Sequence, residues 1–361
     1  MNAYVKRDLY LNRLIVRRDN GQIKAVTGPR RSGKSFLLDP IYKDYLLSKG
    51  VPEDNIIIIS FDIEDEDTPQ ELLDREKLKE YLYSRIASQT ENYYVFLDEI
   101  QEVDGFERIV NGLNKRQNVD VYVTGSNSKF LSSEINTIFR GRSDEVSVLP
   151  FTFREFCQDR QESVNDLWKE YYTYGGLPAL RKMPTAEQKT TYLQKLWKKT
   201  YLDDVVERHN VENREALEAI ADALCSSIGS LTNTTRITNT LGSVRKIKIT
   251  DDTVAKYIGY LEEAFLFNEA RRYNIKGNRY YENIKKYYSI DVGLRNARLN
   301  YRQLEQTHLM ENIIFNELLY RGYVVDVGVV EHRKMVDGKS EYKQYEVDFI
   351  ATDGNEKYYI Q

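Results

Sequence analysis

The sequence predicts an α/β fold with a parallel sheet flanked by helices, and three observations lead to this prediction. A glycine-rich octet, GPRRSGKS (28–35), stands between a β-rich stretch and a helical one. Two apolar stretches, 93–101 and 119–128, have the length and composition of buried strands. Near the end of the chain, a predicted helix at 308–322 is followed by further β-rich runs. Strands that alternate with helices in this way are typical of α/β proteins.

Length and composition limit the class of protein. The chain has 361 residues, of which 41% are hydrophobic and 30% charged, so two or three globular domains are expected. It contains no run of eighteen apolar residues and no apolar leader, so we expect a cytoplasmic protein with no membrane partner. Cys157 and Cys225 lack metal-ligand spacing. The net charge of −4 argues against a globally basic protein that coats nucleic acid.

The octet matches the pattern Gly-x-x-x-x-Gly-Lys-[Ser/Thr], in which each fixed residue has a physical role. Gly28 and Gly33 let the backbone turn tightly, so that successive N–H groups point into one cavity. Lys34 would reach the β- and γ-phosphates, and the Ser35 hydroxyl would bind Mg²⁺. A β-rich stretch precedes the octet and a helical stretch, 35–50, follows it, as this motif requires. The predicted nucleotide-binding residues are Gly28, Pro29, Arg30, Arg31, Ser32, Gly33, Lys34 and Ser35.

A carboxylate pair follows the apolar strand YYVFLDEIQ (93–101). Asp98 is predicted to hold the Mg²⁺ and its water shell, and Glu99 to polarise the attacking water. Taken alone, the pair would fit the start of a solvated loop. Behind a phosphate-binding loop, we prefer the catalytic interpretation. Two other stretches, 55–62 and 119–128, are predicted to be further buried strands of the same sheet.

Two arginines precede another predicted strand, in IFRGRSDEVSV (138–148). Arg142, or Arg140 as a second choice, could complete the γ-phosphate site of a neighbouring subunit as an arginine finger. Such a role would imply a homo-oligomer. The alternative is a surface arginine at a helix C-terminus, where the helix dipole favours a cation.

Five stretches in this order, GPRRSGKS, FLDEIQEVDGFE, VTGSNSKFLS, RGRSDEVSVLPFTFREF and YGGLP, carry a family resemblance. The chain resembles the bacterial and archaeal AAA-type P-loop ATPases that have a C-terminal nuclease-like domain of unknown function. The resemblance implies ATP with Mg²⁺, an AAA+ core at 1–154, and a helical lid at 155–211 with YGGLP (174–178) as an inter-helix turn. It also implies that Ser126 or Asn127 contacts the γ-phosphate, unless these residues form an ordinary turn.

Residues 212–300 are predicted to form a winged-helix domain, because three helices precede two β-rich runs around KGN (276–278). Eleven Lys or Arg residues against six acidic ones between Arg236 and Lys286 give this region a local charge of +5. Such a hairpin could grip DNA phosphates. The alternative is a protein-binding module, because the last helix carries several carboxylates. The candidate DNA contacts are Arg271, Arg272, Lys276, Arg279, Lys285 and Lys286.

Residues 301–361 resemble part of the PD-(D/E)xK nuclease fold, with Glu311 on the helix and Asp348 on a following strand. Acidic groups at these places would bind a metal ion and activate water. Alternatively, Asp348 is a carboxylate at a strand edge. In the resembled pattern a lysine follows two positions after Gln361, where the sequence ends, so we expect a truncated module that cleaves DNA poorly.

Taken together, these expectations describe Mg²⁺-dependent ATP binding and hydrolysis coupled to a DNA-associated module. Two alternatives stay open. One is a nucleotide-gated switch that turns over slowly and binds protein partners. The other is a DNA nuclease in the full-length protein.

Overall fold

The computed structural model describes residues 4–62, 69–125, 138–139, 141–336 and 339–361. The chain divides into two compact units, Met1–Leu149 and Pro150–Gln361, and the boundary lies close to the one expected after residue 154. Among the described residues, no helix is long and apolar enough to cross a membrane.

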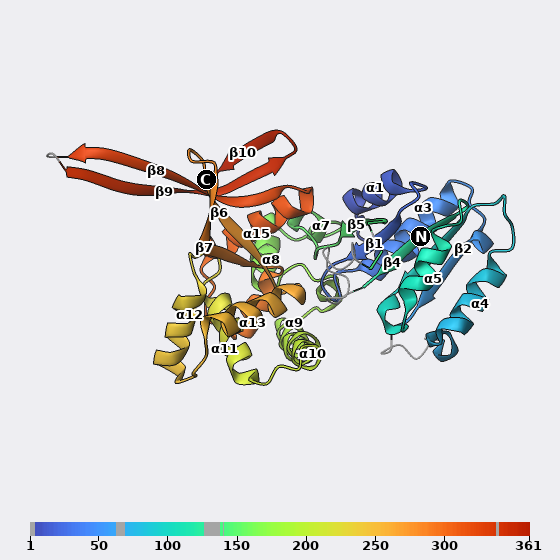
Figure 1. The fold of residues 1–361 in the computed structure, drawn as a ribbon, viewed down its shortest axis with the longest axis horizontal. Helices are drawn as coiled ribbons and strands as arrows, with labels where there is room; N and C mark the ends of the chain where they lie inside the picture. Colours follow the sequence, from blue (N-terminus) through green and yellow to red (C-terminus); the bar gives the residue numbers. More distant parts are fainter. Residues whose placement is uncertain (1–3, 63–68, 126–137, 140, 337–338) are drawn as a thin grey trace. The chain divides into compact units, whose positions relative to one another are not determined.

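The first unit is built on a five-stranded sheet in the order β2-β3-β4-β1-β5 (Figure 1). Every strand pair in it is parallel, which confirms the predicted α/β fold. The sheet places β4 between β1, which leads into the octet, and β3, which carries the carboxylate pair. The strands are β1 (Ile23–Thr27), β2 (Ile56–Ser60), β3 (Tyr93–Asp98), β4 (Val119–Thr124) and β5 (Ser143–Ser147).

Both faces of this sheet are covered, so its central strands are buried along their whole length. One face packs against α4 (Arg75–Arg85) and α5 (Phe106–Leu113) in a single hydrophobic cluster. The other face packs against the helical segments that surround Tyr42, whose ring contacts the rings of Phe96 and Tyr122. Those segments are α1 (Asp8–Arg17), α2 (Lys34–Phe36), η1 (Leu37–Tyr42) and α3 (Lys43–Ser48). Short turns of helix in the connections of this unit are η2 (Glu53–Asn55), η3 (Gln70–Leu73) and η4 (Ile100–Glu102).

The single helix predicted at 35–50 is interrupted. Asp39 has an extended backbone, with φ −130° and ψ 114°, between two helical stretches. The ring of Pro40 disfavours the helical region for the residue before it, which explains the break. The proline therefore has a larger effect than its position near the first turn suggested.

A buried ion pair lies on the same face of the sheet as Tyr42. Lys24 is fully buried and its ammonium contacts the carboxylate of Asp120, which is 5% exposed. Asp120 also accepts hydrogen bonds from the Tyr122 hydroxyl at 2.7 Å and from the Asp19 amide at 3.0 Å. The carboxylate is therefore compensated on several sides, as a buried charge must be.

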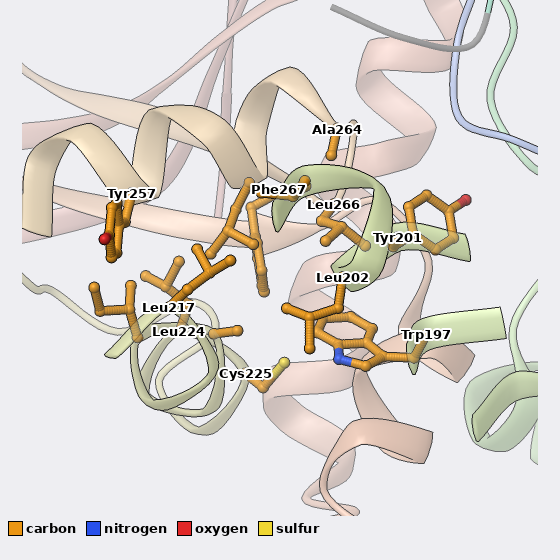
Figure 2. Close-up of a cluster of buried hydrophobic side chains, with 14 of the residues drawn as sticks. Trp197, Tyr201, Leu202, Leu217, Leu224, Cys225, Tyr257, Ala264, Leu266 and Phe267 are labelled. Atoms are coloured by element: carbon orange, nitrogen blue, oxygen red, sulfur yellow. The ribbon is translucent and has the colours of Figure 1, made fainter. Parts of the chain in front are cut away.

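The second unit contains a helical part with one continuous hydrophobic core. Figure 2 shows Trp197, Tyr201 and Leu202 beside Leu217 and Phe267 in this core. The predicted lid and the predicted winged-helix region therefore share their interior. The helices are α7 (Phe153–Phe156), α8 (Val164–Tyr174), η6 (Pro178–Lys182), α9 (Ala186–Lys195), η7 (Leu196–Leu202), α10 (Asp203–Arg208), α11 (Arg214–Ser226), α12 (Thr234–Thr240), η8 (Leu241–Arg245), α13 (Asp251–Glu263), α14 (Val292–Arg298) and α15 (Gln306–Arg321).

The hairpin predicted as a wing belongs to a second five-stranded sheet, in the order β10-β9-β8-β6-β7. Its first strand runs parallel to β8, so it pairs with the region predicted as a separate nuclease-like module. Helix α15 packs on one face, where the rings of Phe315 and Tyr288 stack at 4.2 Å. Figure 1 shows β8 and β9 continuing as a long two-stranded ribbon. The strands are β6 (Phe267–Asn274), β7 (Arg279–Ser289), β8 (Val324–Val336), β9 (Lys339–Asp353) and β10 (Glu356–Ile360).

The YGGLP stretch turns the chain after α8 and also packs on a buried carboxylate. A Cβ added to Gly175, which has a φ of 80°, would lie 2.1 Å from Oδ1 of Asp291. Asp291 accepts hydrogen bonds from the amides of Gly176 at 2.7 Å and Leu294 at 3.0 Å. Burial raises the pKa of Asp291 to about 6, although these amide hydrogen bonds oppose the shift.

Replacing Asp291 with Asn is expected to change how stability depends on pH. Because the folded pKa of Asp291 lies above the unfolded value of about 3.9, the folded protein holds a proton that the unfolded chain releases. The unfolding free energy of the wild type should therefore fall, relative to Asp291→Asn, by about 3 kcal/mol as the pH rises from about 4 to 7. Urea unfolding at several pH values measures this difference. The exposed control Asp353→Asn should run parallel to the wild type, and a parallel Asp291→Asn curve would contradict the expectation.

Candidate active site

The octet after β1 has the backbone of a phosphate-binding loop. Three of its residues have positive φ, namely Gly28 at 132°, Arg31 at 62° and Gly33 at 93°. A Cβ at Gly28 would lie 2.2 Å from the carbonyl oxygen of Val148, so only glycine fits there. Helix α2 begins at Lys34, directly after Gly33, which aims its first amide groups toward the loop.

Lys34 lies inside this loop with its side chain only 4% exposed. Its ammonium donates hydrogen bonds to the carbonyls of Gly28 and Pro29, both at 3.1 Å, and lies 3.9 Å from a carboxylate oxygen of Glu99. Burial lowers the pKa of Lys34, while Glu99 and Asp98 oppose the shift. A phosphate group in the loop would add negative charge beside Lys34 and so favour its charged form.

Asp98 is the last residue of β3, and hydrogen bonds link its carboxylate to β4 and to the phosphate loop. Its Oδ1 accepts a hydrogen bond from the Thr124 hydroxyl at 2.5 Å. Burial raises the pKa of Asp98, and hydrogen bonds from Thr124 and Ser35 oppose the shift. The Glu99 amide donates to the same Thr124 hydroxyl at 2.9 Å. Thr124, the last residue of β4, thus holds the carboxylate pair beside the phosphate loop.

Glu99 has a left-handed backbone, with φ 52° and ψ 42°, which is uncommon for a residue other than glycine. Its carboxylate accepts a hydrogen bond from Nε2 of Gln101 at 2.5 Å. Its side chain is 17% exposed, so one part still faces solvent. Strained backbone of this kind is concentrated at functional sites, where neighbouring contacts hold it in place.

The residues of the loop fit a phosphate group and Mg²⁺. The Ser32 side chain is fully buried, and its hydroxyl has no hydrogen-bond partner among the described residues. The exposed Ser35 hydroxyl and the Asp98 carboxylate are oxygen ligands of the kind that Mg²⁺ prefers. Across the described ranges, no three His, Cys, Asp or Glu side chains gather where they could hold a metal ion. A Mg²⁺ here would therefore rely on one carboxylate, one hydroxyl and the phosphate oxygens, as in P-loop ATPases.

The remaining predicted residues of the ATP site are placed as follows. In the loop, Pro29 is buried, Arg30 is half-buried and Arg31 is exposed. Arg142 is exposed and lies at the amino end of β5, where the amide of Ile23 donates to its carbonyl at 2.8 Å. Because β5 runs parallel to β1, this is the edge of the sheet opposite the phosphate loop, so Arg142 cannot serve the site of its own chain. The predicted residues Ser126, Asn127 and Arg140 lie outside the described residues.

Comparisons with known proteins agree with this geometry. Residues 20–157 match the AAA domain family, and residues 165–305 match a domain of unknown function (DUF8612). An uncharacterized protein of Haemophilus influenzae is 35% identical over 99% of this chain and 86% of its own length. The chain belongs to that protein's family. It carries an AAA domain, as the motifs predicted.

The AAA-domain protein is also similar to a more distant relative and to one solved structure. The uncharacterized protein MJ1544 of Methanocaldococcus jannaschii is 28% identical over 93% of this chain and 73% of its own length. The solved structure of the Walker-type ATPase PABY2304 of Pyrococcus abyssi superposes with a TM-score of 0.57, covering 82% of this chain and 96% of that one at 16% identity. At that identity, the second likeness concerns the fold alone.

Only part of the predicted DNA-contact set is exposed in the AAA-domain protein. Arg271, Lys276 and Arg279 face solvent. Lys285 is half-buried and pairs with Glu269 at 2.6 Å. We expected all six cations on an exposed wing, but Arg272 is 6% exposed and Lys286 is 3% exposed. The reason is that the hairpin lies within the second sheet, so one of its faces is covered.

The two residues predicted to bind a metal in the nuclease-like region, Glu311 and Asp348, both have partners within the protein. The ammonium of Lys286 lies 2.9 Å from Glu311 and 2.6 Å from Glu346, and the Tyr288 hydroxyl donates to Glu311 at 2.7 Å. Glu311, which we assigned to Mg²⁺, therefore forms an ion pair with Lys286. Asp348 accepts a hydrogen bond from the Gln361 amide group at 3.3 Å. These contacts fit a structural role for the cluster.

Two residues of the site were not predicted from the sequence. Thr124 was passed over because threonine at the end of a strand is ordinary for its β propensity. Arg7 donates a hydrogen bond from its guanidinium to the carbonyl of Ser32 in the phosphate loop at 2.8 Å. Arg7 precedes the octet by a whole helix and strand, and no motif marks it. The strand order, in which β4 separates β1 from β3, is the signal that could have pointed to Thr124.

Proposed function

We propose that this AAA-domain protein binds Mg-ATP at GPRRSGKS and hydrolyses it. The single observation that carries this proposal is the convergence of Lys34, Ser35, Asp98 and Glu99 at one edge of a parallel sheet. The AAA domain match and the fold likeness to a Walker-type ATPase support it.

Each residue has a defined task in this proposal. Lys34 neutralises charge on the β- and γ-phosphates, and the loop amides orient the same groups. Ser35 and Asp98 would hold Mg²⁺, which when bound offsets charge that develops on the phosphate oxygens. Glu99 orients and polarises the attacking water through its carboxylate. Such a site acts mainly by positioning and by electrostatic stabilisation.

The second unit is proposed to contact DNA through its exposed cations Arg271, Lys276 and Arg279. Because few base-reading side chains accompany them, the contacts would go to phosphates. Arg142, at the opposite sheet edge from its own phosphate loop, is proposed to act on a neighbouring subunit in a homo-oligomer.

One observation favours a second candidate, a slow nucleotide-gated switch that binds protein partners. Half of the predicted DNA contacts are not fully exposed: Arg272 and Lys286 are buried, and Lys285 is half-buried and pairs with Glu269. This leaves a smaller basic surface than the sequence indicated. A nuclease activity in the full-length protein is less favoured, because Lys286 pairs with Glu311.

Phosphate release from Mg-ATP, with and without duplex DNA, tests the proposal. We expect turnover in the wild type, stimulation by DNA, and loss of both nucleotide binding and turnover in Lys34→Ala. The matched control Lys43→Ala changes a lysine of the following helix, whose ammonium pairs with Glu53 at 3.0 Å, and should retain activity. A combined Arg271→Ala and Arg279→Ala variant should keep basal turnover and lose the stimulation by DNA.

The outcomes separate the candidates. Nucleotide binding without turnover, with or without DNA, would favour the switch. Turnover that DNA does not change would withdraw the DNA proposal and keep the ATPase. No binding of Mg-ATP by the folded wild type would overturn the proposed function.

A further inference from the structure

A buried arginine directly before the first helix joins the phosphate loop to the end of the first unit. Arg7 is 3% exposed, and its Nη1 donates to the Ser32 carbonyl at 2.8 Å while its Nη2 donates to the Leu149 carbonyl at 2.7 Å. The guanidinium lies over the ring of Tyr10, 4.5 Å from its centroid. The Tyr10 hydroxyl accepts a hydrogen bond from the Leu149 amide at 2.9 Å. The carbonyl and the amide of Leu149 therefore form hydrogen bonds with the side chains of Arg7 and Tyr10.

A second set of contacts brings the loop against the same segment. The Val148 amide donates to the Thr27 carbonyl at 2.8 Å, directly before the octet. The Val148 carbonyl fills the space where Gly28 would carry a Cβ. Leu149 is the last residue of the first unit, and the chain continues from it into Pro150. The phosphate loop and the exit from the first unit thus touch at several points.

We propose that Arg7 is a positioning residue that couples the phosphate loop to Leu149, so that Mg-ATP binding changes the stability of the segment leaving the first unit. This inference rests on the proposed function, because Mg-ATP must occupy the octet. The guanidinium is planar and its donors have a fixed geometry, so its two carbonyl partners are held at a set separation. A shift of the Ser32 carbonyl when phosphate binds must be taken up at Leu149 or at the hydrogen bonds of Arg7.

Coupling of this kind works in both directions. If Mg-ATP stabilises the Leu149 segment through Arg7, then loosening that segment must weaken Mg-ATP binding by the same factor. Hydrogen bonds from a charged donor are stronger than neutral ones, and losing one costs about tenfold or more in an equilibrium constant. Lysine at position 7 has a single point of charge and would restore only one of the two hydrogen bonds.

Amide hydrogen exchange on the full chain tests the inference, first without nucleotide. Arg7→Met should speed exchange in two separate segments, 28–34 and 145–151. The matched control Arg17→Met removes an ion pair between the same helix and Asp144 of β5, and should leave both segments unchanged. Tyr10→Phe removes the acceptor for the Leu149 amide and keeps the ring beneath Arg7, so it should speed exchange at 145–151 and spare 28–34. Unchanged exchange in both segments of Arg7→Met would overturn the inference.

The second part of the experiment adds Mg-ATP. In the wild type, both segments should become protected. In Arg7→Met, affinity for Mg-ATP should fall about tenfold or more, and protection should remain in the loop and disappear at 145–151. Arg7→Lys should lie between the two. Equal affinity and equal protection in Arg7→Met and the wild type would contradict the coupling.

The design separates failure of the inference from failure of the proposed function. If the wild type does not bind Mg-ATP, the proposed function fails, and the exchange without nucleotide still decides whether Arg7 joins the two segments. If Arg7→Met does not fold, Arg7→Lys supplies the comparison in both segments, and Tyr10→Phe supplies it at 145–151 alone.

Discussion

Replacing Glu99 with Gln is expected to leave Mg-ATP binding nearly unchanged and to lower the turnover number by about 10²–10⁴-fold. The amide keeps the size of the side chain and its neighbours Gln101 and Lys34, so the loop should retain its shape. It cannot accept a proton from water or polarise it as a carboxylate does. Binding of a fluorescent ATP analogue and single-turnover phosphate release measure the two effects separately.

The matched control for Glu99→Gln is Glu102→Gln, the same chemical change three positions later in the same turn. This control should reduce turnover by less than about threefold, because the half-buried Glu102 is not one of the residues that converge on the phosphate loop. A Glu99→Gln protein that turns over like the wild type would remove Glu99 from the proposed role. Loss of nucleotide binding in Glu99→Gln would instead show that Glu99 supports Lys34.

Replacing Asp120 with Asn should destabilise the first unit by about 3–5 kcal/mol. The change leaves the fully buried ammonium of Lys24 without its carboxylate, and a buried charge without a partner is the costly case. For a unit of this size, the melting temperature should fall by roughly 10 °C. Scanning calorimetry of the wild type and variant measures the shift.

A surface pair provides the comparison for Asp120→Asn. Lys43 and Glu53 are 3.0 Å apart but Glu53 is 72% exposed, so Glu53→Ala should cost less than about 1 kcal/mol. The double variant Lys24→Met with Asp120→Asn should be more stable than Asp120→Asn alone, because it removes the uncompensated charge. If Asp120→Asn, Glu53→Ala and the double variant all lost a similarly small unfolding free energy, Asp120 would not be the group that compensates the buried charge of Lys24.

Local pattern was sufficient to predict the strands of the first unit and the stretches that form the centre of its candidate site. Lys34 and Asp98 each belong to a short stretch in which strand, turn and chemistry are encoded together. The strands β1, β2, β3 and β4 are apolar enough to be recognised one at a time. The break at Asp39 is also encoded locally, by Pro40, but we expected that proline to be tolerated near the first turn of the helix.

Long-range pairing explains most of what the sequence did not reveal. Lys286 of β7 is buried because its ammonium contacts Glu311 of α15 and Glu346 of β9, and nothing within the hairpin itself indicates these neighbours. Arg7 and Leu149 meet only after the whole first unit has folded. Thr124 acquires a role because β4 lies between β1 and β3, a property of sheet order and not of the strand itself.

The core shared by the predicted lid and the helices that follow it limits how the protein can be shortened. A chain ended after Val211 would keep Trp197, Tyr201 and Leu202 but lose the partners that cover them, such as Leu217 and Phe267. Large aromatic surface exposed in this way promotes aggregation. A chain ended at Leu149 would keep every buried member of the core around α4 and α5. The natural place to divide this protein for separate study is therefore before Pro150.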